Sequence, residues 1–386
     1  MGCQCPSGNR PNKDQVDITH FEIVGAIGKG GFGMVHIVKK KTDPKVGDGG
    51  ILAMKRMGKA QLMQSEVFIK VAWLERNVLQ RTRSLFTPML YYAFQDNIHL
   101  YLVMDFLAGG DLEHHITTHH TFKVEIARFF ASEIALGLED LHRNHIVHHD
   151  LKPSNIVLDR QGHARITDFG LATILDPNTD YKTRFKGGTP GFMAPELDDG
   201  SEHGIEPDFF SFGATLYYLL KGRPPFKSTE EMIAQKAEPS SWNGIDDGAK
   251  DLIQRLMAFN LKNRLTVWNE VKAHGFFSGV DWPQLRKRKG CGPLEIAPNS
   301  WDNFSAHVFA LDILEPEAQE AVADNNKFAG YEYDYRKAWS KPTPKRRHSL
   351  SSAGSSRAIS TVRRSSAGAS TGEGSPSSPD SQQPLR

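Results

Sequence analysis

The sequence predicts an α+β fold in two lobes, a small lobe of mainly antiparallel strands with one main helix and a larger, mainly helical lobe. Short apolar and β-branched runs with glycine-rich connections fill the region from about residue 20 to residue 106, which is typical of antiparallel hairpins. Farther along, residues 121–143 have the pattern of a long amphipathic helix, and residues 209–220 are apolar on nearly every face, as in a buried central helix. Strands followed by helices are typical of the α+β class.

The composition fits such a fold. The chain has 386 residues, of which 39% are hydrophobic, and a net charge of +2, which argues against a dedicated nucleic-acid binder. Its three cysteines are Cys3, Cys5 and Cys291, too few for a disulfide framework, and they indicate a reducing compartment. No apolar run approaches the roughly 18 residues of a membrane span and no secretory segment is present, so we expect a cytoplasmic protein.

The first strands form a hairpin around a glycine-rich loop. The residues after the last glycine, Val35 to Val38, are too few and too β-branched for the helix of a dinucleotide-binding unit, so a strand is expected. Glycines in the connection would let backbone N–H groups approach phosphates. The expected phosphate cover is Ile27, Gly28, Gly30, Gly31, Phe32, Gly33 and Val35. A glycine-rich hairpin without a ligand is the alternative.

The next strand and the main helix of the small lobe carry opposite charges. Lys55 ends the apolar segment of residues 51–54, where an unpaired ammonium is costly. Ser65 is a suitable N-cap, and in the helix that follows Glu75 lies four residues after Val71, on the apolar stripe. We expect the inward-facing Glu75 to pair with Lys55, so that the lysine is held as a cation for phosphates. A purely structural ion pair is the alternative.

A polar loop after residue 147 holds the remaining chemistry. Asp150 would accept a substrate hydroxyl proton, and Lys152 would steady the transferring phosphoryl group. Residues 156–158 and 164–167 are predicted strands around a turn, and this hairpin would bring Asn155 and Asp168 to one mouth. Amide and carboxylate oxygens are ligands that Mg²⁺ prefers. Together these groups supply what phosphoryl transfer from ATP needs.

In their order along the chain, the segments GKGGFGMV, LAMK, HHDLKPSN, DFG and APE resemble the motif set of protein kinases. LKPSN and GGTPGFMAPE, which contains Thr189, resemble the serine/threonine class. AGGDL, LERNVL and DWPQLRKRKG resemble the AGC group, and HFEIVGAIGKGGFG, AFQD and ITDF look most like its YANK branch. The resemblance covers residues 20 to about 335 and implies ATP and Mg²⁺ as cofactors and protein hydroxyls as substrates.

The resemblance also implies a domain plan. Residues 1–19 would be an N-terminal segment and residues 20–277 the kinase domain, with its small lobe at 20–106 and its large lobe at 107–277. An AGC-like C-terminal extension would cover residues 278–336. From residue 337 to residue 386, Ser, Gly, Pro and Arg dominate, which predicts a disordered tail.

Further site residues follow from the resemblance alone. It implies an adenine pocket with Ala53, Met104 as gatekeeper, a hinge from Asp105 to Leu107, and Asp111. Asp111 also resembles an acidic position that receives a substrate arginine, but two further acidic positions read Ser154 and Tyr218, so we expect at most a modest basic preference. Two structural roles are implied as well: Asp208 would brace the catalytic loop, and Glu196 would form an ion pair with Arg264.

Two regulatory regions depart from the family pattern. His149 stands where many kinases have an arginine that grips a phosphate on the activation loop, and two other positions of that pocket read Val71 and Thr173. A phosphate on Thr183 would therefore meet no arginine cluster, so we expect activity without phosphorylation of that loop. We expect His149 to be a neutral packing residue; an imidazolium below about pH 6.5 is the alternative.

The second departure is in the hydrophobic motif, FAGYEY. Glu332 lies between Tyr331 and Tyr333, where many relatives have a phosphorylatable residue. We expect Phe328 and Tyr331 to insert beside the Glu75 helix and hold it inward. Packing as a mere surface strand is the alternative.

The chain ends suggest contact with a membrane. Gly2 is placed for myristoylation and Cys3 and Cys5 for palmitoylation, although Pro6 stands where a small hydroxyl residue is usual. Basic runs in the tail, where Ser349 and Ser366 resemble basophilic phosphosites, could lean on anionic lipid. We expect a monomer with protein substrates, in the cytoplasm or at the cytoplasmic face of a membrane. The rival hypothesis is a pseudokinase that acts as a membrane-associated scaffold.

Overall fold

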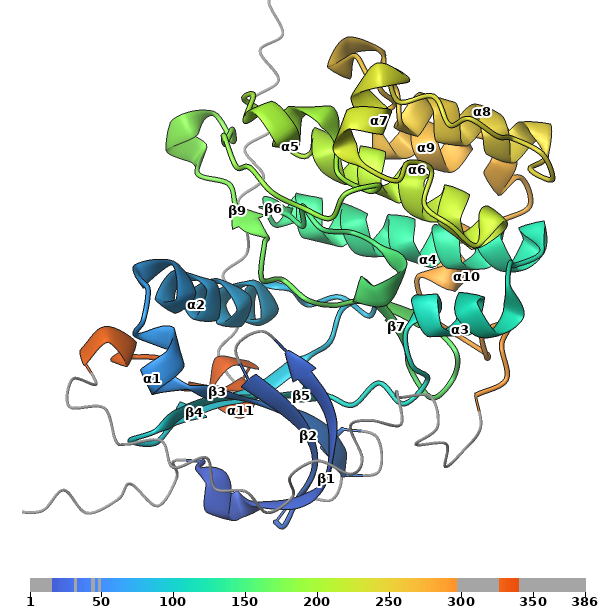
Figure 1. Cartoon of the computed structure of the whole chain (residues 1–386). Coiled ribbons are helices and arrows are strands. Elements are labelled where there is room, and N and C mark those ends of the chain that lie inside the picture. The colour runs from blue at the N-terminus through green and yellow to red at the C-terminus, as the bar shows by residue number, and fades with distance from the viewer. Residues whose placement is uncertain (1–15, 31–32, 43–45, 48–49, 297–325, 340–386) are drawn as a thin grey trace, which may run out of the picture. The chain divides into compact units, whose positions relative to one another are not determined.

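The computed structural model describes residues 16–30, 33–42, 46–47, 50–296 and 326–339. Two compact units divide the chain, Met1–Lys341 and Pro342–Arg386, and all described residues belong to the first. The fold is the predicted α+β class, with an antiparallel sheet in the small lobe and a helical large lobe (Figure 1).

An antiparallel sheet forms the small lobe, with the strand order β1-β2-β3-β5-β4-β10. The last strand comes from the C-terminal extension and pairs with β4, so the extension covers an edge that β4 would otherwise leave open. The strands are β1 (Phe21–Gly30), β2 (Gly33–Lys40), β3 (Ile51–Gly58), β4 (Leu90–Gln95), β5 (His99–Asp105) and β10 (Tyr333–Asp334).

A strand follows the glycine-rich loop, as predicted, and this excludes the dinucleotide-binding alternative. Gly33 pairs with Gly30 on one side and with Met57 on the other. A Cβ atom added to Gly33 would lie 1.8 Å from the carbonyl oxygen of Arg56. Close packing of β2 against β3 therefore requires glycine here, in addition to any approach of phosphate.

The main helix of the small lobe is α2 (Glu66–Arg81), which follows the short α1 (Lys59–Leu62). Ser65 is its N-cap, as predicted, and accepts a hydrogen bond from the backbone N–H of Val67 at 3.2 Å. Figure 1 shows α2 lying along the sheet. Its buried side chains are Ile69, Ala72, Glu75, Val78 and Leu79, so the stripe that faces inward carries one carboxylate.

The large lobe is built around α4 (Val124–Arg143) and α6 (Glu206–Lys221), which pack together. The predicted start of α4 at residue 121 is wrong by three residues, because the N–H of Phe122 bonds to the carbonyl of Leu219 and holds that stretch outside the helix. The other helices are α3 (Leu112–His119), α5 (Pro195–Asp199), α7 (Thr229–Ala234), α8 (Asp247–Leu256), α9 (Trp268–Ala273) and α10 (Trp282–Leu285).

Two short hairpin-like pairs position the polar loop. Strands β7 (Ile156–Leu158) and β8 (Ala164–Ile166) form the predicted antiparallel hairpin, which ends one residue earlier than expected. Strands β6 (Ile146–Val147) and β9 (Thr173–Ile174) pair on the other side of the loop. The single-turn 3₁₀ helix η2 (Pro153–Asn155) lies between β6 and β7.

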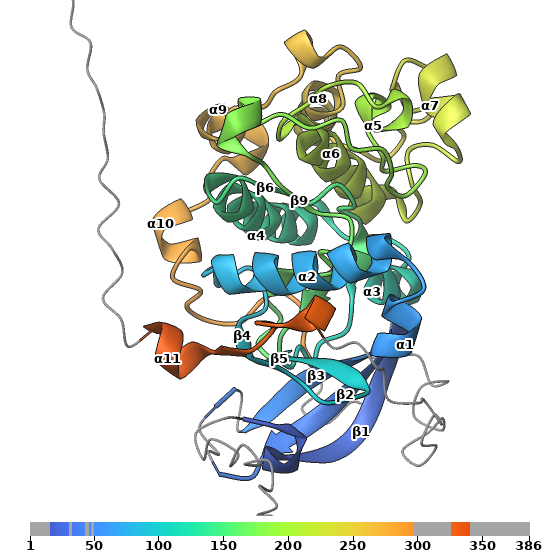
Figure 2. The ribbon, with the colours of Figure 1, turned by 90° about the vertical axis from the view of Figure 1, so that its left-hand side faces the viewer.

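The C-terminal extension returns to the small lobe. Its described end comprises η7 (Asn326–Phe328), β10 and α11 (Tyr335–Trp339), which Figure 2 shows beside β4 and α2. The remaining short 3₁₀ turns are η1 (Ile18–His20) in the small lobe and η3 (Pro177–Thr179), η4 (Leu261–Asn263) and η5 (Gly275–Phe277) in the large lobe. Within the described residues, no helix is long and apolar enough to cross a membrane.

Candidate active site

Lys55 and Glu75 form the ion pair that the sequence predicts. The Nζ atom of Lys55, on β3, lies 2.6 and 2.7 Å from the two carboxylate oxygens of Glu75, on α2. The side chains are 16% and 7% exposed, so the pair is largely shielded from water. Burial alone would lower the pKa of Lys55, but the charges of Glu75 and Asp168 outweigh it and raise the pKa. The lysine is therefore a fixed cation beside the DFG segment.

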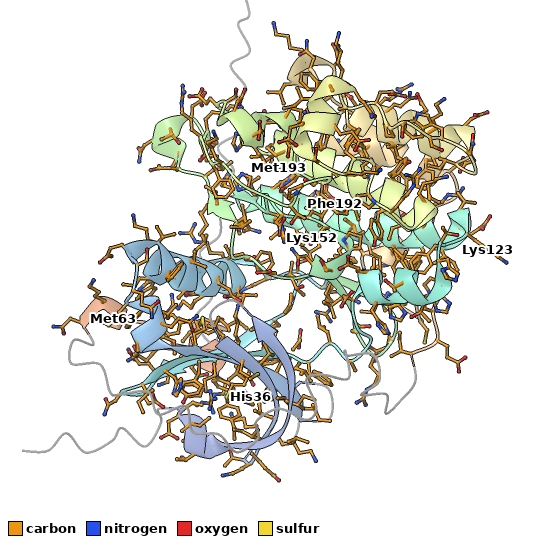
Figure 3. The ribbon with its side chains drawn as sticks, in the orientation of Figure 1. His36, Met63, Lys123, Lys152, Phe192 and Met193 are labelled. Atoms are coloured by element: carbon orange, nitrogen blue, oxygen red, sulfur yellow. The ribbon has the colours of Figure 1, made fainter. Side chains whose placement is uncertain are left out.

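Asp150 and Lys152 both contact the hydroxyl group of Thr189, a contact that the sequence did not predict. Thr189 Oγ1 donates to Asp150 Oδ1 at 2.6 Å and accepts from Lys152 Nζ at 2.6 Å. Lys152 Nζ also lies 2.9 Å from Asp150 Oδ2. Figure 3 shows Lys152 on the segment between β6 and β7, and Phe192 and Met193 on the segment leading to α5. The segment after the activation loop is thus tied to the predicted catalytic loop.

Asp208 holds the catalytic loop through two backbone N–H groups. This fully buried carboxylate, near the start of α6, accepts the backbone N–H groups of His148 at 2.8 Å and His149 at 2.9 Å. His142 Nε2 donates to it at 2.8 Å, while His142 Nδ1 accepts from the indole N–H of Trp268 at 3.1 Å. Burial would raise the pKa of Asp208, but the hydrogen bond and charge of His142 outweigh it and lower the pKa to about 2, so the carboxylate stays ionised.

Asn155 and Asp168 are brought to one place, as the predicted hairpin requires. The backbone N–H of Thr167, next to Asp168, bonds to the carbonyl of Asn155 at 2.8 Å. Asn155 Nδ2 donates to the Asp150 carbonyl at 2.8 Å and to Asp150 Oδ2 at 3.2 Å. The amide therefore turns its oxygen away from Asp150, which suits a ligand to a hard cation.

These donors fit Mg²⁺ bound together with a nucleotide. Among the described residues, no three His, Cys, Asp or Glu side chains gather as a self-contained metal site. Mg²⁺ is commonly held by one or two protein oxygens plus substrate phosphates and water. Asn155 and Asp168 supply such a pair, with the ammonium of Lys55 near Asp168 for the phosphates.

The predicted adenine pocket lies where β3 and β5 pair. Ala53 is the register partner of Met104, and Leu52 that of Asp105. Leu107 follows β5 and is buried. The carboxylate of Asp105 accepts from the backbone N–H of Met89 and the hydroxyl of Tyr91, so any adenine contact of Asp105 must come from its backbone.

Asp111 has a structural partner of its own. It is the N-cap of α3 and accepts the backbone N–H of His114 at 2.8 Å. The buried pair of Glu196 with Arg264 is also present, with Arg264 Nη2 3.1 Å from Glu196 Oε2. Gly31, Phe32, Gly2, Cys3, Cys5, Ser349 and Ser366 lie outside the described residues.

Comparison with known proteins agrees with this geometry. Residues 21–277, more than half of the chain, match the protein kinase domain family. The chain belongs to the protein kinase family. Ribosomal protein S6 kinase beta of Caenorhabditis elegans is 32% identical to this kinase over 344 residues, which cover 85% of this chain and 62% of that protein.

Two further relatives give the same placement. The RAC family serine/threonine-protein kinase homolog of Dictyostelium discoideum is 36% identical over 285 residues, covering 72% of this kinase and 62% of that protein. Human serine/threonine-protein kinase 32C is 33% identical over 290 residues, covering 72% and 58%. The kinase thus spans about three fifths of the length of these relatives. Such relatives support an AGC-group kinase, whereas the finer YANK placement stays a prediction.

The activation segment of this kinase, from the DFG motif at Asp168 to the APE motif at Glu196, is held by stacked rings. His149 is fully buried, and its ring stacks on Phe185 with centroids 4.4 Å apart and planes 9° apart. Its Nε2 atom lies 3.2 Å from Nε2 of His203, and its Nδ1 atom 3.1 Å from the carbonyl oxygen of Leu171. Burial lowers the pKa of His149 to about 4, which favours the predicted neutral packing residue.

Thr183 is tied to the same cluster through its backbone. Its N–H donates to the carbonyl of His203 at 2.9 Å, and the N–H of His203 donates back at 3.0 Å. Thr173 Oγ1 lies 3.4 Å from His149 Nδ1, so these two positions of the altered phosphate pocket meet. Neither His203 nor Phe185 was predicted, because both lie far along the sequence from His149 and belong to no motif.

The hydrophobic motif packs against α2. Phe328 and Tyr331 are fully buried, and the Tyr331 ring lies edge-on to Trp73 at 5.3 Å. The guanidinium of Arg76 donates to the backbone carbonyls of Gly330, Tyr331 and Glu332 at 3.5, 3.2 and 3.1 Å. The motif therefore does insert beside the helix that carries Glu75.

Glu332 and Tyr333 take different places around that insertion. The exposed carboxylate of Glu332 accepts from Gln95 Nε2 at 2.8 Å, and the same amide donates to the Phe328 carbonyl at 2.9 Å. Tyr333 pairs with Ala93 at the edge of the sheet. The motif thus joins α2 to β4.

Proposed function

We propose that this chain is a serine/threonine protein kinase, which transfers the γ-phosphoryl group of ATP to Ser or Thr hydroxyls of protein substrates in intracellular signalling. One observation carries the proposal: the Lys55–Glu75 pair is formed beside Asp168, and Asp150 lies in a braced loop, so all the expected reacting groups are assembled at once. We also propose that the chain belongs to the YANK branch of the AGC group.

The residues divide the work as follows. Mg²⁺, bound through the phosphates with Asn155 and Asp168, would neutralise charge on the transferring group. Lys55 orients the α- and β-phosphates, and Glu75 keeps the ammonium in place. Asp150 accepts the proton of the substrate hydroxyl. Lys152, within reach of Asp150 and Thr189, balances charge beside the transferred group.

We further propose that the kinase does not need a phosphate on its activation loop. The support is the stack of His149 on Phe185, which already ties the catalytic loop to the activation segment with rings instead of an arginine–phosphate contact. In the same way, the motif at Phe328 and Tyr331 would hold α2 inward without an upstream kinase. The domain limits 20–277, 278–336 and 337–386 belong to the proposal, as does an acylated N-terminus at Gly2, Cys3 and Cys5 that brings the monomer to an anionic membrane.

The test is transfer from Mg²⁺-ATP to a panel of Ser and Thr peptides by the full chain, before and after phosphatase treatment. We expect transfer to survive phosphatase and to fall at least about 1,000-fold in Asp150→Asn, since the general base is lost. The matched control is Asp247→Asn, an exposed carboxylate in the first turn of α8, which should leave the rate unchanged. A folded wild-type chain without transfer would instead support the pseudokinase scaffold.

A further inference from the structure

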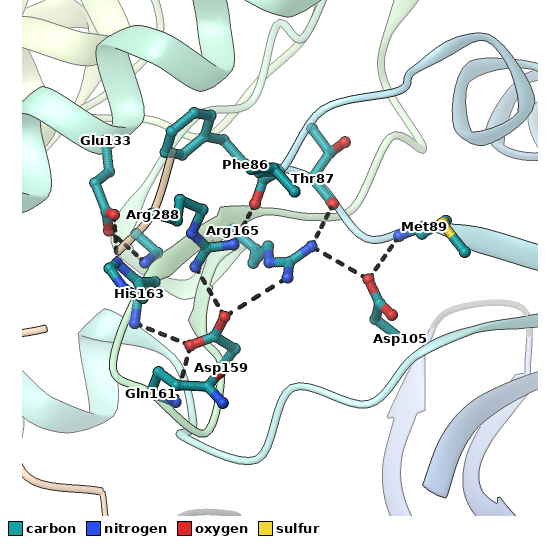
Figure 4. Close-up of polar contacts among 12 residues, drawn as sticks. Phe86, Thr87, Met89, Asp105, Glu133, Asp159, Gln161, His163, Arg165 and Arg288 are labelled. Carbon is teal, nitrogen blue, oxygen red and sulfur yellow. Dashed lines mark hydrogen bonds and ion pairs between the residues drawn. The ribbon is translucent and has the colours of Figure 1, made fainter. Parts of the chain in front are cut away.

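Three hydrogen-bond donors hold the carboxylate of Asp105, a residue of the predicted adenine hinge. Its Oδ2 accepts from the backbone N–H of Met89 at 3.0 Å and from Arg165 Nη1 at 3.2 Å, and its Oδ1 accepts from the hydroxyl of Tyr91 at 2.9 Å. Figure 4 shows Asp105 between Met89 and Arg165. The side chain is 18% exposed, so these contacts are largely shielded from water. Of these three partners only Arg165, on β8 in the large lobe, carries a charge.

Arg165 stands between two carboxylates. Besides Asp105, its guanidinium lies 3.6 Å from Asp159 Oδ2, and it donates to the carbonyl of Thr87 at 3.0 Å. The side chain is only 15% exposed. The guanidinium reaches Asp105 through Nη1 and Asp159 through Nη2, so the attraction of both carboxylates sets its position.

Arg288, in the C-terminal extension, gives Asp159 a second and closer cation. Its Nη2 donates to the same Oδ2 atom of Asp159 at 2.8 Å, and the side chain is 6% exposed. The guanidinium also donates to the carbonyl of Leu85 and lies 5.6 Å from the centre of the Phe86 ring. Arg288 thus satisfies Asp159 and leaves Arg165 to Asp105.

The segment around Arg288 is closely docked. The N–H of Gly292 donates to the carbonyl of Gln161 at 2.7 Å, and a Cβ atom at Gly292 would lie 1.9 Å from the carbonyl oxygen of Gly162. His163 places one ring nitrogen 2.6 Å from Glu133 and the other 3.1 Å from the Gly290 carbonyl. Figure 4 shows Glu133, His163, Asp159 and Arg288 in this cluster. The approach leaves no room for a side chain at Gly292.

We infer that Arg165 and Arg288 are positioning residues for the nucleotide: Arg288 pairs with Asp159, so that Arg165 stays on Asp105 and fixes the adenine hinge. This rests on the proposed function, in which the hinge binds adenine. Loss of Arg288 leaves Asp159 as an underpaired, mostly buried carboxylate, which draws Arg165 away from Asp105. The C-terminal extension therefore sets nucleotide affinity without touching the nucleotide.

The experiment compares binding of Mg²⁺-ATP by calorimetry with kcat, KM for ATP and KM for a peptide, all on the full chain. In Arg288→Met, and in Arg165→Met, we expect Kd and KM for ATP to rise about fivefold, with kcat and peptide KM within about twofold. Adding Asp159→Asn to Arg288→Met should restore the Kd to within about twofold of wild type, since the competing charge is gone.

Arg286→Met is the matched control. Arg286 lies in the same segment and pairs with Glu139 and Asp140 of α4 at 2.6 and 2.7 Å, not with Asp105, Asp159 or Arg165. It should lower the melting temperature about as much as Arg288→Met and leave the Kd for ATP unchanged. The inference is overturned if Arg286→Met and Arg288→Met change the Kd for ATP equally, or if neither changes it. It is also overturned if Asp159→Asn does not restore the Kd of Arg288→Met. A wild-type chain that binds no Mg²⁺-ATP would instead refute the proposed function.

Discussion

The activation segment and the hydrophobic motif solve the same problem in opposite ways. In many of the kinases that this chain resembles, the activation segment and the hydrophobic motif each carry a regulatory phosphate. At the activation segment this chain lacks the expected cation, and the buried rings of His149 and His203 with the half-buried ring of Phe185 make the contact. At the hydrophobic motif the chain supplies a permanent anion, Glu332, on Gln95. Under the proposal above, the first site would not need an anion, whereas the second has an anion in its sequence.

The two sites also differ in what carries the energy. Both Phe328 and Tyr331 are fully buried large side chains, and truncating such a residue to alanine typically costs about 3–5 kcal/mol. The hydrogen bond of exposed Glu332 is worth far less, because water competes for it. Apolar burial should therefore dominate at the motif and charge should only adjust it.

The largest effect is expected from removing the motif. A chain that ends at residue 325, or the double variant Phe328→Ala with Tyr331→Ala, should lose about 100-fold in kcat/KM, because α2 loses the contacts that hold Glu75 toward Lys55. Peptide phosphorylation measures it. A chain ending at residue 341 keeps the motif and should match the full chain.

Tyr331→Phe sharpens this result. Among the described residues the Tyr331 hydroxyl is buried and has no hydrogen-bond partner, and burial raises its pKa well above the usual value. Removal of an unsatisfied hydroxyl should cost nothing and could stabilise the contact. Full loss of activity in Tyr331→Phe, or an unchanged rate in the chain ending at residue 325, would contradict the apolar account.

The second prediction uses the pH dependence of stability at His149. Its pKa is about 4 in the fold, against about 6.5 for a histidine in an unfolded chain. Above pH 6.5 both states are neutral, and as the pH falls toward 4 only the unfolded chain binds the proton. Stability is therefore present at neutral pH and lost in acid.

Between pH 7 and pH 5 this difference is worth about 2 kcal/mol, roughly a 30-fold change in the folding equilibrium. Urea unfolding should show wild type losing that much more stability than His149→Gln over this range, whatever the absolute stability of the variant. Groups that affect the His149 charge, namely Asp208, His203 and His148, are present in both proteins. Parallel pH curves would mean that the buried ring already carries a proton, and the neutral-stack account would fail.

The same comparison shows how far sequence alone reaches. The glycine hairpin, the Ser65 cap and the Lys55–Glu75 pair were predictable, because each follows from neighbours within a strand or helix or from complementary charges on inward faces. The start of α4 was predicted three residues too early, because it depends on a hydrogen bond from Phe122 to Leu219, almost a hundred positions away.

The stack and the hinge support were not predictable, for a related reason. His203 is 54 positions from His149, and Arg288 is 129 positions from Asp159. Neither pair has a spacing that local periodicity can reveal. A histidine in place of an arginine showed that the phosphate pocket was altered, but not which residues had filled it.

The third prediction concerns the built-in anion. Glu332→Gln removes the charge while keeping an oxygen that can accept from Gln95, so activity should fall only about threefold, equal to about 0.6 kcal/mol. The decrease should shrink at high salt, because an exposed charge is screened. Glu270→Gln, an exposed glutamate on α9, is the matched control. A loss as large as that of the Phe328 and Tyr331 double variant would show that charge, not burial, carries the contact.

The smallest effect is expected at Thr183. Thr183 and His203 exchange two backbone hydrogen bonds, and alanine at position 183 keeps both. Thr183→Ala and Thr183→Glu should therefore stay within about twofold of wild type in peptide phosphorylation, since no phosphate contact is removed or imitated. Phe185→Ala is the positive control and should cost about tenfold, because it removes the ring that stacks on His149. If Thr183→Ala abolished turnover in a folded chain while Phe185→Ala did not, the activation segment would depend on phosphate after all, and the two sites would differ less than their residues suggest.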